Sequence, residues 1–141
     1  MREYIDGAVF RDMVLCAYDA LSANEQAVNE LNVFPVPDGD TGTNMCLTLG
    51  TAAAELRKNG ASPTLTATAD RVASALLRGA RGNSGVILSL LFRGMSKVFK
   101  GMADADGAAL ASAMNEVRYV VTKNTGVAVK AVDVCVDSMT L

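Results

Sequence analysis

The stretch VFPVPDGDTGTN, residues 33–44, interrupts a chain that otherwise has the apolar spacing of successive helices. Pro35 and Pro37 are incompatible with a helix interior, and each pushes the preceding residue into extended geometry. Residues two apart in an extended segment point the same way, so Asp38 and Asp40 are expected to direct two carboxylates at one place. Two adjacent anions are costly unless a cation joins them, and carboxylate oxygens suit Mg²⁺. The loop therefore predicts a magnesium site, and the alternative is a surface turn built from common turn residues.

Five segments carry apolar residues at helical spacing, each introduced by a suitable start. They begin after Asp6, near Thr43, after Pro63, at Ser84 and after Asp106. The first stripe runs to about residue 31, and its apolar members, including Met13, are expected in the core. Residues 127–137 alternate valine with other residues, which is typical of a strand but also suits the end of a packed helix. The pattern predicts an all-α fold.

A second glycine-rich loop, GARGNSG at residues 79–85, precedes the fourth predicted helix. Its GxxGxxG spacing is neither the dinucleotide GxGxxG nor a P-loop. Both this loop and the one at 33–44 lead into a helix start, where unpaired N–H groups favour anions. A metal site beside two such helix ends has the components needed for phosphoryl transfer. For residues 79–85 alone, the alternative is a simple glycine-rich turn between two helices.

Composition narrows the function classes. The 141 residues suffice for one domain, and the net charge of −2 with few aromatics argues against a nucleic-acid platform. Histidine is absent, which removes Ser-His triads. No apolar run reaches the roughly 18 residues of a membrane span, and the charged N-terminus does not resemble a secretory signal. The three cysteines, Cys16, Cys46 and Cys135, are expected to be buried thiols in a reduced cytoplasm.

The charges are unevenly distributed. Six basic residues and no acidic residue occur between positions 71 and 103: Arg71, Arg78, Arg81, Arg93, Lys97 and Lys100. This cluster is either a solvated helix face or a region that meets an anionic ligand. The apolar fourth helix also has more hydrophobic surface than one short bundle buries, so a homodimer is expected to cover it.

The two loops resemble those of the nucleotide-binding, DhaL-like domain shared by bacterial fatty acid kinases and the L subunit of dihydroxyacetone kinases. The similar stretches are LNVFPVPDGDTGTNM, residues 31–45, and GARGNSGVILSLLFRG, residues 79–94. The resemblance extends from residue 6 to about residue 116. It implies a bundle or incomplete barrel of amphipathic antiparallel helices that binds ADP or ATP through Mg²⁺ at one rim.

The resemblance also implies roles for individual residues. Asp38 and Asp40 would hold magnesium. Asn32 corresponds approximately to the position of a third, acidic ligand in the dihydroxyacetone branch. Here the residue is an amide, and it is one residue further from the two aspartates than in that branch. Thr41 replaces a histidine of that branch, which favours the fatty acid kinase branch, whose acyl substrate is delivered by a separate DegV-like carrier protein. The nucleotide would meet the two helix starts: Thr41, Thr43, Asn44, Gly82, Asn83 and Ser84.

Residues 117–141 lack the KPxEGT-like motif that follows in the family, so residues 1–141 are expected to form a single domain that is incomplete after about residue 116. Whether this chain is itself an active kinase is left open. It resembles the ATP-binding domain of a fatty acid kinase-like phosphotransferase. The alternatives are a non-catalytic remnant or interaction module of the same family, and a dihydroxyacetone kinase-like subunit.

Overall fold

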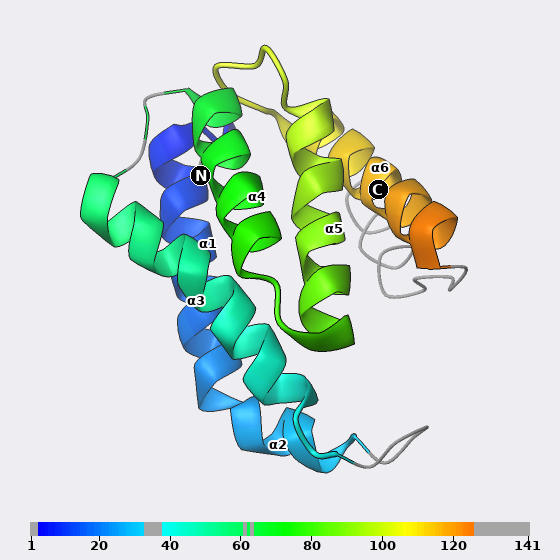
Figure 1. Ribbon diagram of the computed structural model, residues 1–141. Coiled ribbons are helices and arrows are strands. Elements are labelled where there is room, and N and C mark those ends of the chain that lie inside the picture. Colours follow the sequence, from blue (N-terminus) through cyan, green and yellow to red (C-terminus); the bar gives the residue numbers. More distant parts are fainter. Residues whose placement is uncertain (1–2, 33–37, 61, 63, 126–141) are drawn as a thin grey trace.

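The computed structural model describes residues 3–32, 38–60, 62 and 64–125, and these form a bundle of α-helices (Figure 1). The helices are α1 (Gly7–Ala23), α2 (Glu25–Glu30), α3 (Thr41–Asn59), α4 (Leu65–Gly79), α5 (Gly82–Val98) and α6 (Gly107–Thr125). An isolated antiparallel bridge between Ile5 and Ala105 is the one β-type pairing in the described residues. The predicted all-α class is confirmed.

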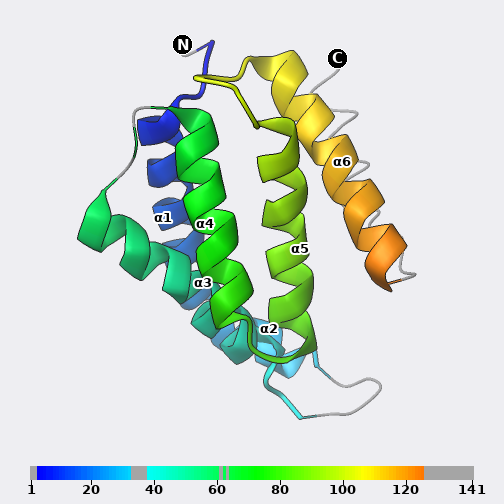
Figure 2. The same ribbon diagram turned by 45° about the horizontal axis from the view of Figure 1, so that its top comes forward.

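Helix α3 has the most helix neighbours in the bundle. Helix α3 lies against α1, α2, α4 and α5, whereas α6 packs against α5 and makes no contact with α1 within the described part. Figure 2 shows α1 and α6 on opposite sides of the bundle, with α4 and α5 between them. Among the helices that the structure describes, none combines the length and the apolar content needed to cross a bilayer.

The core lies where α1, α3, α4 and the end of α5 meet. Phe10 and Phe99 contact edge to face with ring centroids 6.0 Å apart. Around them Leu49, Leu56 and Leu76 are almost completely buried, and burial of each such side chain stabilises the fold by about 1.5–3 kcal/mol. The buried residues Phe10, Leu49, Leu56 and Leu76 thus lie in segments where the sequence has apolar residues at helical spacing.

Two helix starts form as the sequence predicts. The Asp6 carboxylate accepts a hydrogen bond from the Val9 N–H at 2.9 Å, and the Asp106 carboxylate accepts one from the Ala109 N–H at 2.9 Å. Each bond pairs one of the donors that a helix N-terminus leaves unsatisfied. Helix α6, which begins after Asp106 as predicted, continues to Thr125.

Several expectations differ from the structure. Helix α1 ends at Ala23 because Asn24 caps it and donates its side-chain amide to the Ala20 carbonyl at 2.8 Å, so the rest of the stripe forms the separate helix α2. Met13 is 43% exposed and Leu31 79% exposed, so the expectation that the whole first stripe is core was wrong at both residues. Cys46 is buried as predicted, but Cys16 is exposed because it lies on the solvent side of α1. Cys135 and the segment 127–137 lie outside the described residues.

Candidate functional site

The N-termini of α3 and α5 lie side by side at one end of the bundle, the lower end in Figure 1. The Ser84 hydroxyl at the start of α5 donates a hydrogen bond to the Thr41 carbonyl at the start of α3 at 3.1 Å, across 43 positions of sequence. The fold thus brings together the two helix starts that the sequence singled out. The candidate site consists of the residues at these two helix starts together with Asp38 and Asp40.

Thr48 joins the two helices one turn further in. Its side chain is fully buried, donates to the Asn44 carbonyl at 2.7 Å, and accepts from the Arg81 N–H at 3.0 Å. A Cβ atom at Gly85 would collide with the Thr48 hydroxyl, so the close approach of α5 to α3 depends on a glycine there. The threonine therefore anchors the start of α5 on α3.

Gly82, the first residue of α5, needs a glycine for two reasons. Its φ of 65° lies in the left-handed region that side chains disfavour, and a Cβ atom would collide with the Asn44 side-chain amide. The glycine thus lets the chain turn into α5 while Asn44 lies directly against it. Gly82 and Asn83 are exposed, whereas Asn44 and Ser84 are partly buried.

Helix α2 holds the start of α3 through Asn29. The Asn29 side chain accepts from the Thr43 N–H at 2.9 Å and donates to the Thr43 hydroxyl at 3.0 Å. Gly42 makes room for this contact, since a Cβ atom there would collide with the Glu25 carbonyl and lie 3.0 Å from the Asn29 oxygen. The first turn of α3 is therefore fixed from one side by α2.

Asp38 and Asp40 present exposed carboxylates directly before α3. Asp40 occupies the N-cap position, yet its side chain makes no capping hydrogen bond. No hydrogen bond or ion pair links either carboxylate to another described residue. The Asn32 side-chain oxygen accepts a hydrogen bond from the Asp40 N–H at 3.2 Å. An aspartate at an N-cap usually accepts a hydrogen bond from its own helix. Because the Asp40 carboxylate does not, and Asp38 is also without a partner among the described residues, both carboxylates remain available to an added cation.

These residues fit a hydrated Mg²⁺ ion. No group of three or more His, Cys, Asp or Glu side chains that could enclose a metal occurs in the described portion of the chain. Magnesium usually keeps several waters and uses one or two carboxylates together with substrate phosphates, so a pair of aspartates is a sufficient donor set.

The two helix starts offer unpaired backbone donors. The first intrahelical bonds are made by the Asn44 N–H to the Asp40 carbonyl and by the Gly85 N–H to the Arg81 carbonyl. The three N–H groups before each have no partner within their helix, and Asn29 takes that of Thr43. Among the described residues, the other five have no hydrogen-bond partner: the N–H groups of Thr41, Gly42, Gly82, Asn83 and Ser84. With two helix dipoles converging, this end of the bundle attracts anions.

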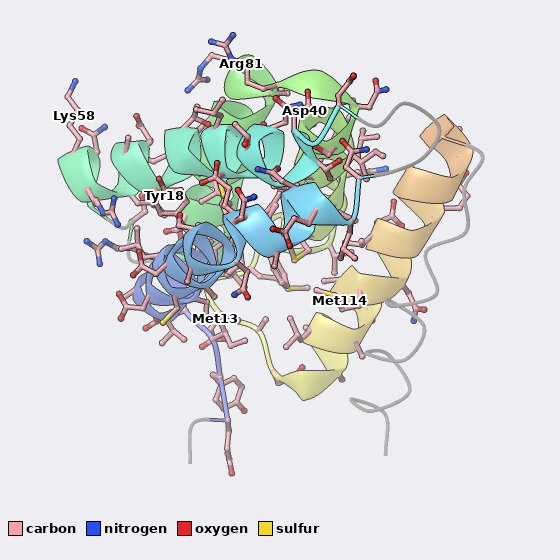
Figure 3. All side chains as sticks on the ribbon, turned by 90° about the horizontal axis from the view of Figure 1, so that it is seen from below. Met13, Tyr18, Asp40, Lys58, Arg81 and Met114 are labelled. Carbon is pink, nitrogen blue, oxygen red and sulfur yellow. The ribbon has the colours of Figure 1, made fainter. Side chains whose placement is uncertain are left out.

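Three contributors were not predicted from the sequence: Asn29, Thr48 and Arg81. Arg81 is exposed, and Figure 3 shows it on the same side of the molecule as Asp40, with its side chain extending away from the ribbon. Its guanidinium makes no bond to another described residue, which leaves a positive charge free at the N-cap of α5. The basic cluster gave a signal for Arg81 but did not separate it from the others. Arg71 is structural, because its guanidinium donates to the Gly60 carbonyl at 2.6 Å.

Other reactive or hollow places lie apart from this site. Burial raises the pKa of the Cys46 thiol, and the Glu25 charge adds to the effect, so Cys46 is a poor nucleophile at neutral pH. A pocket of about 320 Å³ lies between α4 and α5, with Asp70 and Arg93 among its lining residues. It shares no residue with the site.

A known protein family matches the part of the chain that contains both helix starts. The family model of the DAK2 domain matches residues 35–135, a range that contains both helix starts and continues beyond residue 116.

Curated bacterial proteins are also similar. Protein YloV of Bacillus subtilis is 44% identical over 110 residues, which are 78% of this chain and 20% of YloV. An uncharacterized protein of Staphylococcus epidermidis is 50% identical over 97 residues, 69% of this chain and 17% of that protein. An uncharacterized protein of Staphylococcus aureus strain USA300 is 46% identical over 107 residues, 76% of this chain and 19% of that protein. The chain thus spans a fifth or less of the length of these relatives.

The matched range covers most of the chain and includes every residue of the two helix starts. By this match the chain belongs to the DAK2 domain family, the dihydroxyacetone-kinase-like nucleotide-binding domains.

Proposed function

We propose that this domain binds ADP or ATP together with Mg²⁺ as the nucleotide-binding part of a phosphotransferase. The observation that carries the proposal is the pairing of two helix N-termini, joined by the bond from Ser84 to the Thr41 carbonyl, with the two carboxylates of Asp38 and Asp40, which have no partner among the described residues. Unpaired N–H groups suit phosphate oxygens, and the carboxylates suit the cation that accompanies a nucleotide.

In this proposal the chain acts by positioning. The five free N–H groups hold phosphate oxygens, and the Arg81 guanidinium adds positive charge beside them. Asp38 and Asp40 hold Mg²⁺, with Asn32 near enough to orient the Asp40 backbone. Mg²⁺ held by these carboxylates would supply positive charge that offsets the negative charge of the phosphates. Gly82 and Asn44 shape the entrance of α5, so that backbone rather than side chain approaches the phosphates.

The acceptor follows from the resemblance to the fatty acid kinase branch. We infer an acyl carboxylate presented by a DegV-like carrier protein. A carboxylate is ionised at neutral pH and requires no general base. Apolar side chains near the site support an apolar acceptor or partner: Leu47 is 56% exposed, Val86 48% and Ile87 37%, all within the first two turns of α3 or α5. A homodimer would cover the same exposed apolar side chains. We also infer a cytoplasmic location, because it accompanies the proposed kinase role.

Isothermal titration calorimetry with ADP tests the proposal. We expect binding in the presence of Mg²⁺ and at least tenfold weaker binding after EDTA treatment. Equal affinity in both conditions would contradict the metal site, and no binding at millimolar ADP in either condition would favour a non-catalytic interaction module. A chain that binds Mg-ADP but does not transfer phosphate to dihydroxyacetone or to a carrier-bound fatty acid would keep the binding role without the activity.

A further inference from the structure

We propose that Asn29, on α2, is a positioning residue for phosphate binding, because it leaves the Thr43 hydroxyl as a hydrogen-bond donor. The inference rests on the proposed nucleotide function and goes beyond it by assigning the task to a residue outside both loops. It starts from the two bonds that Asn29 makes with Thr43, at 2.9 Å and 3.0 Å.

Hydrogen-bond chemistry fixes the orientation of the Asn29 amide. A backbone N–H can only donate, so the atom that faces the Thr43 N–H must be the side-chain oxygen. The side-chain nitrogen then faces the Thr43 hydroxyl, and an amide nitrogen can only donate. The hydroxyl oxygen is therefore the acceptor in this contact.

The consequence falls on the single hydroxyl hydrogen of Thr43. Because the hydroxyl accepts from Asn29, its own hydrogen is not used in that bond, and no described residue accepts it. Thr43 belongs to the first turn of α3, directly after the free N–H groups of Thr41 and Gly42. Phosphate oxygens accept hydrogen bonds and do not donate them when ionised, so a hydroxyl held as a donor suits them.

The packing of α2 against α3 keeps the Asn29 side chain next to Thr43. A Cβ atom at Gly42, one residue before Thr43, would collide with the Glu25 carbonyl and lie 3.1 Å from the Val28 Cβ, so α2 lies close against this turn of α3. Asn29 lies on the same short helix, so its side chain stays within hydrogen-bond distance of Thr43. The amide also occupies the Thr43 N–H, so α3 directs two N–H groups and one hydroxyl at an anion instead of three N–H groups.

A double-mutant cycle on Mg-ADP affinity tests the assignment. Asn29→Asp keeps an acceptor for the Thr43 N–H but replaces the donor with a second acceptor, toward which the hydroxyl would turn. Thr43→Val removes the hydroxyl and keeps the N–H. We expect Asn29→Asp to weaken binding about tenfold more in the wild-type background than in the Thr43→Val background. The reason is that one hydrogen bond to a charged group changes affinity by about that factor. The added negative charge acts in both backgrounds and cancels in the cycle.

Three outcomes are decisive. An equal loss from Asn29→Asp in both backgrounds would overturn the positioning role while leaving nucleotide binding intact. If Asn29→Asp does not fold, Thr43→Ser against Thr43→Val carries the test: the serine variant should bind as wild type and the valine variant about tenfold more weakly, and equal affinities would overturn the inference. Absence of Mg-ADP binding in the wild-type protein would overturn the proposed function and this inference together.

Discussion

The side-chain amide of Asn29 engages both polar groups of Thr43, accepting from its N–H at 2.9 Å and donating to its hydroxyl at 3.0 Å. Together with the bond from Ser84 to the Thr41 carbonyl, it ties α2 and α5 to the same turn of α3. The start of α3 is therefore held by Asn29, which is not expected to touch ligand, whereas the charged side chains at the rim, Asp38, Asp40 and Arg81, have no bonding partner among the described residues. Substitutions of these two kinds of residue should have different effects on stability and on binding.

Asp38→Asn and Asp40→Asn should weaken Mg-dependent ADP binding by tenfold or more and leave stability almost unchanged. Both carboxylates are exposed and unpartnered among the described residues, so their removal should change the free energy of unfolding by no more than about 0.5 kcal/mol. Calorimetry and urea unfolding measure the two quantities. Asp70→Asn, which removes an exposed carboxylate of α4, is the matched control and should leave affinity unchanged.

Gly82→Ala should destabilise the protein and disturb the site. The alanine would adopt a φ of 65° and displace the Asn44 side chain. The backbone strain costs about 1–3 kcal/mol. Gly60→Ala is the control, because Gly60 has a φ of 70° with open space around it and so tests the backbone cost alone. Urea unfolding and Mg-ADP titration should show ADP affinity lowered in Gly82→Ala and unchanged in Gly60→Ala; an affinity loss in both would argue against a local effect of Asn44.

Thr48→Val should cost about 1–3 kcal/mol of folding free energy, because the Arg81 N–H would lose its acceptor in a partly buried place. Thr48→Ser keeps the hydroxyl and should lose less, through its missing methyl group alone. Chemical denaturation of the two variants gives the comparison. If valine proves as stable as wild type, Thr48 does not anchor the start of α5 in the way described.

The two described cysteines should differ in reactivity. Cys16 is exposed, whereas Cys46 is buried, and burial raises its pKa, so less thiolate forms at a given pH. In a Cys135→Ser background, a thiol reagent such as DTNB at pH 8 should modify one group rapidly and the second only after unfolding. Cys16→Ser should abolish the rapid phase. Rapid loss of both thiols in the folded protein would contradict the packing of α3 against α1 and α2.

Local sequence rules predicted much of the fold because they depend on neighbours. Asp6 and Asp106 were recognisable as caps from the apolar runs that follow them, and both make the expected bond. The break between α1 and α2 was missed because it depends on Asn24, a residue that also fits a helix interior. Met13 was assigned to the core because periodicity gives a face of a helix but not whether another helix covers all of it.

The site was predictable in part for the same reason. Prolines, glycines and aspartates in the two loops marked the helix starts, but periodicity could not predict that Ser84 meets Thr41 or that Thr48 binds Arg81. Asn29 gave no signal, since one asparagine on a short helix resembles a solvated residue. The roles of Asp38, Asp40 and Asn32 in metal binding remain predictions.

Amide chemical shifts of the uniformly ¹⁵N-labelled chain, recorded during titration with Mg-ADP, test most directly whether the two helix starts hold the phosphates. We expect the largest changes at the five free N–H groups of the helix starts, those of Thr41, Gly42, Gly82, Asn83 and Ser84, and small changes at the Thr43 N–H because Asn29 retains it. Changes centred instead on Asp70 and Arg93, in the pocket between α4 and α5, or no change at saturating Mg-ADP, would contradict the account.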